Sequence, residues 1–378
     1  MPKPIEATTA VNSEDPPVIK SGDAHDAHEE ALSHTEDEED DEEEEDEEDE
    51  ANQPLPVEYP GTIIPDDHPE TIDADVDLTK DIKTDTDYID LIHLKIHLME
   101  DLDLGRFKQL ESLCLRQNLL TLMLGIRALE PGKLEELDLY DNRINHISSA
   151  LNEFVNLSNL DLSFNKIKNI KNISNLTKLE NLYFVQNKIK HIRNLELLVK
   201  LKNLELGGNK IETISETMLS LSSLTQLWLG KNRISKLQNL DNLVNLRVLS
   251  IQSNRLTKIE GLEKLVNLEE LYLSHNGISK LEGLENNTKL TVIDVTANKI
   301  SKLENLSHLT QLTDFWCSYN SILSFDEINR ELGKLPELDT VYFEHNPIQT
   351  QNPTAYRRKL RLNLGPSLHK IDATYIHS

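Results

Sequence analysis

Residues 110–120, LESLCLRQNLL, decide the fold of this chain. Leucines stand at 110, 113, 115 and 120 and an asparagine at 118, and the same unit, L-x-x-L-x-L-x-x-N-x-I/L, returns down the chain. Ten intervals separate its asparagines; six are 22 residues long and the others 23 to 26. Such a fixed period predicts a stack of identical structural units. The asparagines, which we expect to form a structural ladder, are Asn118, Asn142, Asn165, Asn187, Asn209, Asn232, Asn254, Asn276, Asn298, Asn320 and Asn346.

Each part of the unit has a physical reading. The L-x-L part predicts a short strand with its leucines inward and the residue between them outward. The asparagine amide should point inside the following turn and bond backbone groups that lack other partners. Apolar residues then come in steps of about three, as in Ile167, Ile170 and Ile173, which favours 3-10 turns. We therefore predict an α/β-type leucine-rich-repeat solenoid, with a curved parallel β-sheet on its concave face and 3-10 turns and short helices on its convex face.

The sequence divides into three parts. Residues 1–75 carry 28 acidic and two basic residues, including the unbroken acidic run Glu36–Glu50, and predict a disordered acidic tail with a proline-containing linker. Residues 76–348 predict the solenoid, with about 12 repeats if the degenerate first copy, residues 89–96, is included. Residues 349–378 predict a C-terminal cap, since the last repeat would otherwise leave an open edge.

Two details concern the C-terminal end. The sequence Ser324-Phe325-Asp326-Glu327 is a capping box, which predicts a short helix running to about Leu332. Five apolar residues are expected to cover the end of the core: Tyr356, Leu360, Leu364, Leu368 and Ile371.

Several kinds of chemistry are not indicated. The formal net charge is −27, which disfavours nucleic acid as a partner. The sequence has no phosphate-binding glycine loop and no Cys-x-x-Cys or His-Glu-x-x-His motif, so we expect no enzyme activity, metal or cofactor. Cys317 lies at a core position, and Cys114 lies at an outward strand position, where a small filler is the favoured reading over an exposed thiol. Without a signal peptide or a long apolar run, we expect no membrane association and a chain of the cytosol or nucleus.

The outward strand positions indicate where a partner binds. Ten of the twelve are acidic or aromatic and none is basic, whereas a merely soluble face would favour Thr, Ser, Lys and Glu. Exposed aromatics at repeated positions are typical of interface hot spots, although aromatics also favour strands and stack between repeats. The neighbouring outward column adds Glu136, Glu270 and Asp314. In chain order the twelve are Asp90, Cys114, Asp138, Asp161, Tyr183, Glu205, Trp228, Ser250, Tyr272, Asp294, Trp316 and Tyr342.

The chain resembles a known family from about residue 88 to 376. Strings outside the repeat consensus carry the resemblance, among them LCLRQN (113–118), LDLYDN (137–142), QSNRLTKIEGL (252–262) and LYLSHNGI (271–278). They are similar to the leucine-rich-repeat regulatory subunit 7 of protein phosphatase 1. The resemblance implies binding of the phosphatase catalytic subunit through the concave face, and a nuclear role in mitosis and in phosphatase maturation. The contact residues that it implies are Asp161, Tyr183, Glu205, Trp228, Asp294, Asp314, Trp316 and Tyr342; the outward column adds Tyr272.

Two features qualify this resemblance. Tyr183 and Trp228 stand where phenylalanine is expected in relatives, and both keep an aromatic ring. The short basic–Val–x–Phe docking peptide of many phosphatase partners is missing from this sequence, so binding would use the folded face of a monomer. Two alternatives stay open: an acidic histone-chaperone-like nuclear protein, whose acidic segment usually follows its repeats, and another leucine-rich-repeat adaptor.

Overall fold

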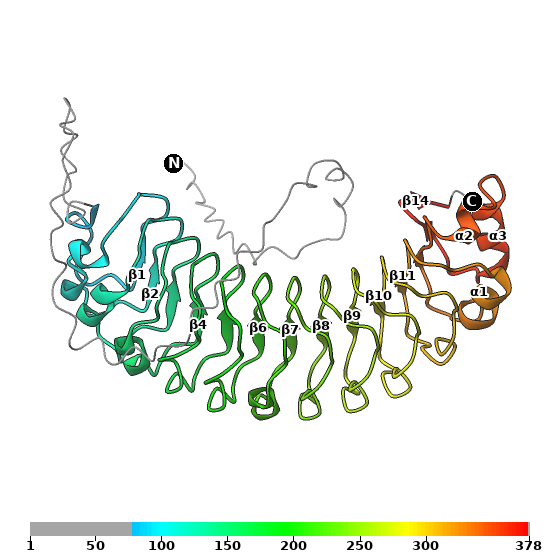
Figure 1. Cartoon of the computed structure of the whole chain (residues 1–378). Helices are drawn as coiled ribbons and strands as arrows, with labels where there is room; N and C mark the ends of the chain where they lie inside the picture. The colour runs from blue at the N-terminus through cyan, green and yellow to red at the C-terminus, as the bar shows by residue number, and fades with distance from the viewer. Residues whose placement is uncertain (1–77, 377–378) are drawn as a thin grey trace, which may run out of the picture. The chain divides into compact units, whose positions relative to one another are not determined.

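A computed structural model describes residues 78–376, and the predicted tail of residues 1–75 lies outside them. Within this range one sheet holds fourteen strands in sequence order, each hydrogen-bonded to the next (Figure 1). The pairs from β1 to β13 are parallel and β13–β14 is antiparallel. The predicted curved leucine-rich-repeat solenoid is confirmed.

The strands are β1 (Tyr88–Asp90), β2 (Ser112–Cys114), β3 (Glu136–Asp138), β4 (Asn159–Asp161), β5 (Asn181–Tyr183), β6 (Asn203–Glu205), β7 (Gln226–Trp228), β8 (Val248–Ser250), β9 (Glu270–Tyr272), β10 (Val292–Asp294), β11 (Asp314–Trp316), β12 (Thr340–Tyr342), β13 (Lys370–Ile371) and β14 (Thr374–Tyr375). The helices are the 3-10 helices η3 (Met99–Leu102), η4 (Leu104–Arg106), η5 (Leu124–Ala128), η6 (Ser149–Glu153) and η7 (Glu216–Ser220), and the α-helices α1 (Phe325–Leu332), α2 (Pro347–Thr350) and α3 (Tyr356–Asn363).

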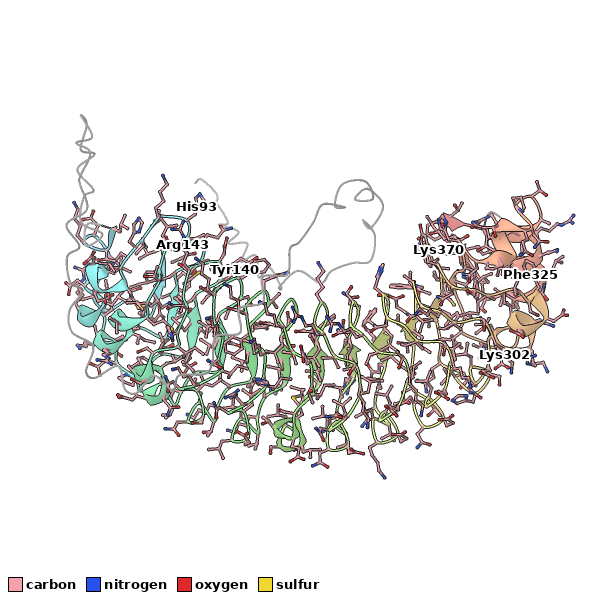
Figure 2. All side chains as sticks on the ribbon, in the orientation of Figure 1. His93, Tyr140, Arg143, Lys302, Phe325 and Lys370 are labelled. Atoms are coloured by element: carbon pink, nitrogen blue, oxygen red, sulfur yellow. The ribbon has the colours of Figure 1, made fainter. Side chains whose placement is uncertain are left out.

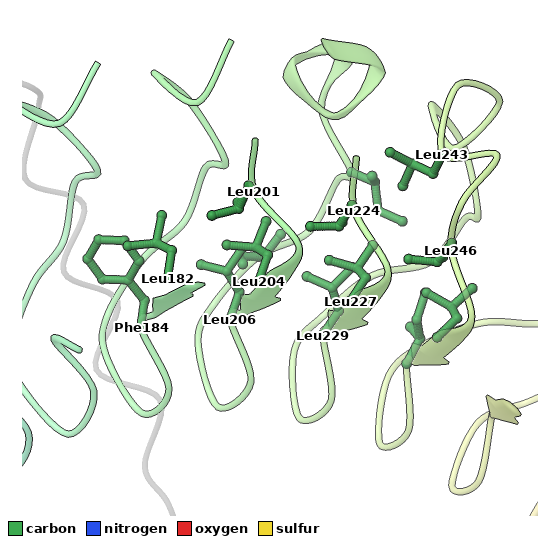
Figure 3. Packing of buried hydrophobic residues seen from close by; sticks show 14 of the residues in the cluster. Leu182, Phe184, Leu201, Leu204, Leu206, Leu224, Leu227, Leu229, Leu243 and Leu246 are labelled. Atoms are coloured by element: carbon green, nitrogen blue, oxygen red, sulfur yellow. The ribbon is translucent and has the colours of Figure 1, made fainter. Parts of the chain in front are cut away.

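The core is a row of identical layers, one from each repeat. The middle residues of successive strands pair directly, so Leu182 lies beside Leu204 and Leu204 beside Leu227. All three are fully buried (Figure 3). Burying a leucine is worth roughly 1.5–3 kcal/mol, but a single layer has no second side to bury it against. The repeats are therefore stable only as a stack.

The ladder asparagines join each repeat to the one before it. Asn209 is typical: its Nδ2 donates to Phe184 O at 2.8 Å and Leu206 O at 3.0 Å, and its Oδ1 accepts from Ile189 N at 3.0 Å. Its neighbours along the solenoid repeat this pattern, and most ladder side chains are buried, whereas Asn254 and Asn276 are half-buried. Each amide thus pairs backbone groups that the tight turn leaves without a strand partner.

A left-handed residue precedes each ladder asparagine. In the middle of the solenoid Gln186 and Lys231 have φ of 54°, and Gly208 has φ of 70°. Only the glycine adopts this conformation without strain. The repeated turn is held by the asparagine and the strand on either side, which is why non-glycine residues are tolerated there.

The convex side follows the predicted step of three with one refinement. In 22-residue repeats single turns are closed by bonds between residues three apart, such as Leu176 N to Ile173 O and Leu179 N to Leu176 O. These turns lengthen into 3-10 helices η5, η6 and η7. Those helices fall in repeats longer than 22 residues, which have chain to spare on this side.

A second row of asparagines lies on the convex side of the solenoid. Asn172, Asn194, Asn239 and Asn305 all have φ near +60°. Each donates to a carbonyl of the previous repeat, as Asn194 Nδ2 does to Ile170 O at 2.6 Å. Asparagine suits the left-handed conformation better than other non-glycine residues. The recurrence of these asparagines is visible in the sequence, but their role depends on the geometry of the turns in which they lie.

The two ends close the core differently. At the N-terminal end the degenerate copy forms β1, and Leu94 N and Ile96 N donate to Asn118. At the C-terminal end α1 begins as predicted, with Ser324 Oγ accepting from Glu327 N at 3.2 Å. The Glu327 carboxylate is used for another contact, since it accepts from Leu303 N of the preceding repeat at 3.0 Å. The five expected cap residues are all buried.

Candidate partner-binding face

Each strand presents two residues away from the core, its first and its third. The third residues form one continuous column (the inner column), since Asp161 pairs with Tyr183, Tyr183 with Glu205 and Glu205 with Trp228. The first residues form the neighbouring column, which contains Asp314. Eight of the nine predicted partner-binding residues lie in the inner column and Asp314 lies beside it.

The C-terminal half of the inner column is aromatic. Trp228 and Tyr272 stack with ring centroids 6.2 Å apart, Tyr272 and Trp316 lie 6.3 Å apart, and Trp316 meets Tyr342 edge-on at 6.0 Å. We call these four residues the aromatic run. Aromatic pairs of this kind contribute about 0.5–1.5 kcal/mol beyond the area that they bury. The rings are half-buried in the free protein and already hold one another in position.

The aromatic run covers the residues between its members. Ser250 is 1% exposed and Asp294 is 7% exposed, because the rings on either side reach over them. The carboxylate of Asp294 accepts a hydrogen bond from Thr296 N at 2.9 Å. Asp294 therefore lies on the predicted face but beneath its neighbours, and its role as a contact residue stays a prediction.

The N-terminal half of the inner column is acidic. Asp138 and Asp161 each accept a bond from the backbone two residues on, at 3.0 Å from Tyr140 N and 2.8 Å from Ser163 N. Burial raises the pKa of Asp161, and its bonds with Ser163 act in the opposite direction. Burial likewise raises the pKa of Glu205. These carboxylates are half-buried and costly to keep charged, which favours a partner that brings compensating positive charge.

Asn203 and Glu205 lie where the acidic and aromatic halves meet. The Asn203 amide donates to Tyr183 OH and to Glu205 Oε1, both at 3.3 Å. Its own carbonyl oxygen is buried without a partner among the described residues. Trp316 Nε1, in the aromatic run, is likewise buried without a hydrogen-bond partner among the described residues. A buried polar atom without a partner costs free energy, and a bound partner can remove that cost.

Two basic residues adjoin the face although the inner column contains none. Arg116 lies 3.1 Å from Asp138 and stacks over the Tyr140 ring at 4.2 Å. Lys370, from the cap, lies 5.4 Å from the Tyr342 ring centre. A hydrogen bond with Tyr342 raises the pKa of Lys370. Neither was predicted, because Arg116 follows β2 and Lys370, which continues the neighbouring column as the first residue of β13, lies in the cap beyond the last repeat.

Some side chains of the neighbouring column already form hydrogen bonds within the protein. Tyr272 OH donates to Glu270 at 2.7 Å, and burial together with this bond raises the pKa of Tyr272. Asp314 accepts from Thr313 Oγ1 at 2.8 Å. These bonds fix the side chains before any partner arrives.

The cysteines do not add chemistry. Cys317 is fully buried, as predicted, and Cys114 is 9% exposed, which agrees with its reading as a small filler. Burial raises the pKa of Cys114 to about 11, so it is a poor nucleophile. In residues 78–376 no group of three or more His, Cys, Asp or Glu side chains is arranged to hold a metal ion. The same residues contain no helix long and apolar enough to span a membrane.

Known proteins share both the sequence and the fold. The family model described as Leucine Rich repeats (2 copies) matches residues 199–242, 222–264, 244–276 and 266–308. The chain is 55% identical over 316 residues to the protein phosphatase 1 regulatory subunit SDS22 of Saccharomyces cerevisiae, covering 83% of this chain and 94% of the relative. It belongs to the SDS22 family. The SDS22 of Schizosaccharomyces pombe is 54% identical over 63 residues, 17% of this chain and 19% of that protein.

Solved structures support the fold of this SDS22 family member. An internalin (inlF) from Listeria monocytogenes has a TM-score of 0.61 and 24% identity, covering 81% of this chain and 94% of that one. The functional domain of InlJ from the same organism has a TM-score of 0.57 and 26% identity, covering 72% and 54%. The family resemblance inferred from the sequence is thus confirmed, while the nine partner-binding residues stay a prediction.

Proposed function

We propose that this chain is a non-catalytic regulatory subunit that binds the catalytic subunit of protein phosphatase 1 through the inner column and its neighbour. The 55% identity to an SDS22 protein supports the identity of the partner. The observation that carries the binding surface is the aromatic run, four rings in contact over six strands of a face without a base in its inner column. Binding would control the activity, maturation or localisation of the phosphatase.

The two halves of the inner column are expected to contribute to binding in different ways. The aromatic run is held in place by its own contacts, so little conformational entropy is lost when a partner covers it. Rings at the centre of an interface carry most of the affinity, and the acidic half chiefly sets orientation and association rate. The partner surface should therefore be basic, with apolar recesses at one end.

The wider proposal rests on the family resemblance and on the formal net charge of −27. The free chain would be a monomer that binds neither nucleic acid nor membranes, and would act in the nucleus and also in the cytoplasm. The competing function is an acidic histone-chaperone-like protein, favoured only by the acidic run Glu36–Glu50. The third candidate function is that of another leucine-rich-repeat adaptor protein.

The deciding experiment is calorimetric titration of the full chain with purified phosphatase catalytic subunit, and separately with core histones. We expect saturable binding of the phosphatase and none of the histones at physiological salt. Histone binding alone would favour the chaperone reading. Binding of neither would leave only the adaptor reading and overturn the proposal.

A second titration tests the surface. Trp316→Ala should weaken phosphatase binding by roughly 2 kcal/mol or more, because it removes the ring between Tyr272 and Tyr342. Lys299→Ala, an exposed change just past a ladder asparagine, should have little effect. Circular dichroism would confirm that both variants fold. Equal binding by folded Trp316→Ala, with a loss in Lys299→Ala, would contradict the proposed surface.

A further inference from the structure

The C-terminal cap contains a groove that the phosphatase-binding face does not use. It has a volume of about 360 Å³ and is lined by residues of α3, of the last two strands and of the segment that follows them. No acidic residue of the described part of the chain lines it. Its walls include Arg357, Arg358 and Arg361 on one side and Ile371, Tyr375 and Ile376 on the other.

Positive charge is concentrated around this groove. Residues 349–376 hold five arginines and lysines and one acid, Asp372, in a chain whose other described repeats are close to neutral. Asp372 is occupied elsewhere: its carboxylate accepts from Phe343 N, Glu344 N and Tyr356 OH. The cap therefore keeps a net positive charge, of which the Asp372 carboxylate compensates only a part through its interaction with Arg357.

The two adjacent arginines of the groove differ in their partners. Some repeat arginines pair with acids, as Arg247 does with Glu269 at 2.9 Å, whereas no acid pairs with Arg357 or Arg358 in residues 78–376. In the groove Arg357 is oriented by bonds to Ile371 O at 2.8 Å and Thr374 O at 3.1 Å. Arg358 has no hydrogen-bond or ion-pair partner in residues 78–376. One guanidinium is thus held in place beside another that is open to a ligand.

Two exposed apolar side chains accompany the arginines. Leu362 is 78% exposed and Tyr375 is 66% exposed, the highest fractions among the large apolar residues of the described chain. Leu362 lies one helical turn after Arg358, on the same face of α3. Exposed apolar side chains next to a charged groove are typical of a surface that a partner covers.

We propose that this groove binds a phosphorylated serine or threonine in a peptide segment of a partner protein, with an apolar side chain of that segment against Leu362 or Tyr375. Guanidinium groups match phosphate oxygens in a bidentate manner, and a doubly charged phosphate suits the adjacent arginines Arg357 and Arg358 better than a single carboxylate does. A concave groove with a fixed Arg357 favours one compact anion over the dispersed charge of a lipid surface. The site is independent of the proposed phosphatase binding.

The test uses the full chain and a fluorescent library of short peptides with phosphoserine fixed at the centre. Fluorescence anisotropy should show binding of this library, and much weaker binding of the same library with serine or glutamate at that position. Arg358→Gln should weaken phosphopeptide binding about tenfold. Arg193→Gln, which removes an exposed arginine on the outer turns, is the matched control and should bind as the parent does.

Each other outcome overturns the site. If the serine library bound as tightly as the phosphoserine library, the groove would not recognise phosphate. If the glutamate library bound as tightly, the groove would be a general site for acidic peptides. Co-sedimentation of the chain with phosphatidylserine vesicles, lost in Arg358→Gln, would indicate a membrane surface instead. Parental phosphopeptide affinity in folded Arg358→Gln would place binding elsewhere. Because Arg358→Gln should titrate the phosphatase catalytic subunit normally, failure here is distinguishable from failure of the proposed function.

Discussion

Replacing Asn209 by alanine tests how the ladder holds the solenoid together. The change removes the bond from Ile189 N and the two shorter amide bonds to Phe184 O and Leu206 O. The two carbonyls keep other donors, since Phe184 O still accepts from Asn187 and Leu206 O from Asn232. Only the Ile189 N–H is left without a partner.

The magnitude follows from that single orphaned group. A buried donor without a partner costs about 1–3 kcal/mol, and the carbonyls lose only the weaker benefit of a second donor. We therefore expect Asn209→Ala to lower the free energy of unfolding by about 1–3 kcal/mol. Asn254→Ala should lower it within the same range, because Ile234 is fully buried and its N–H donates to Asn254 Oδ1.

Urea unfolding followed by tryptophan fluorescence and by circular dichroism is the appropriate assay. Two probes are needed because a stack of repeats can unfold in parts. Asn242→Ala is the matched control: Asn242 donates to Leu219 O at 2.8 Å on the exposed outer turns, where water can replace it. A midpoint for Asn209→Ala equal to that of Asn242→Ala would refute the account of the ladder.

Three further outcomes are expected. Deleting residues 1–75 should leave the unfolding midpoint and phosphatase affinity nearly unchanged, because that segment lacks the composition to form a core; a large loss in either would contradict this. Glu205 has a pKa raised by burial, so its contribution to stability is complete below its usual 4.5 and is lost as pH rises through the folded-state value; Glu205→Gln should flatten this decline in pH-dependent urea unfolding. Asp294→Lys should weaken phosphatase binding, with a larger loss of affinity at low salt, and should also destabilise the fold. Asp294→Asn should keep the hydrogen bond from Thr296 N, so titrations should show a loss of only the salt-dependent part of the phosphatase affinity.

The sequence by itself determined the repeat, the strands and the ladder. Leucines and asparagines recur with a fixed spacing, and a stack of identical units offers them one kind of position each. The short helix after Ser324 and the buried cap residues were also predictable, since capping and apolar spacing are local properties. The outward columns followed from the alternation of a strand, so every candidate contact residue could be placed on one face.

Only the tertiary structure decided how the side chains on that face meet. Trp228 and Tyr272 are two repeats apart, and whether their rings close over Ser250 depends on the size of that residue and the spacing of the strands. The same geometry buries Asp294, which the alternation of the strand had placed in the open. The cap arginines face β14 only because α3 packs on α1 and the chain then returns to the sheet. Periodicity fixes the direction of a side chain; what covers it depends on residues from other repeats and on shapes that no period encodes.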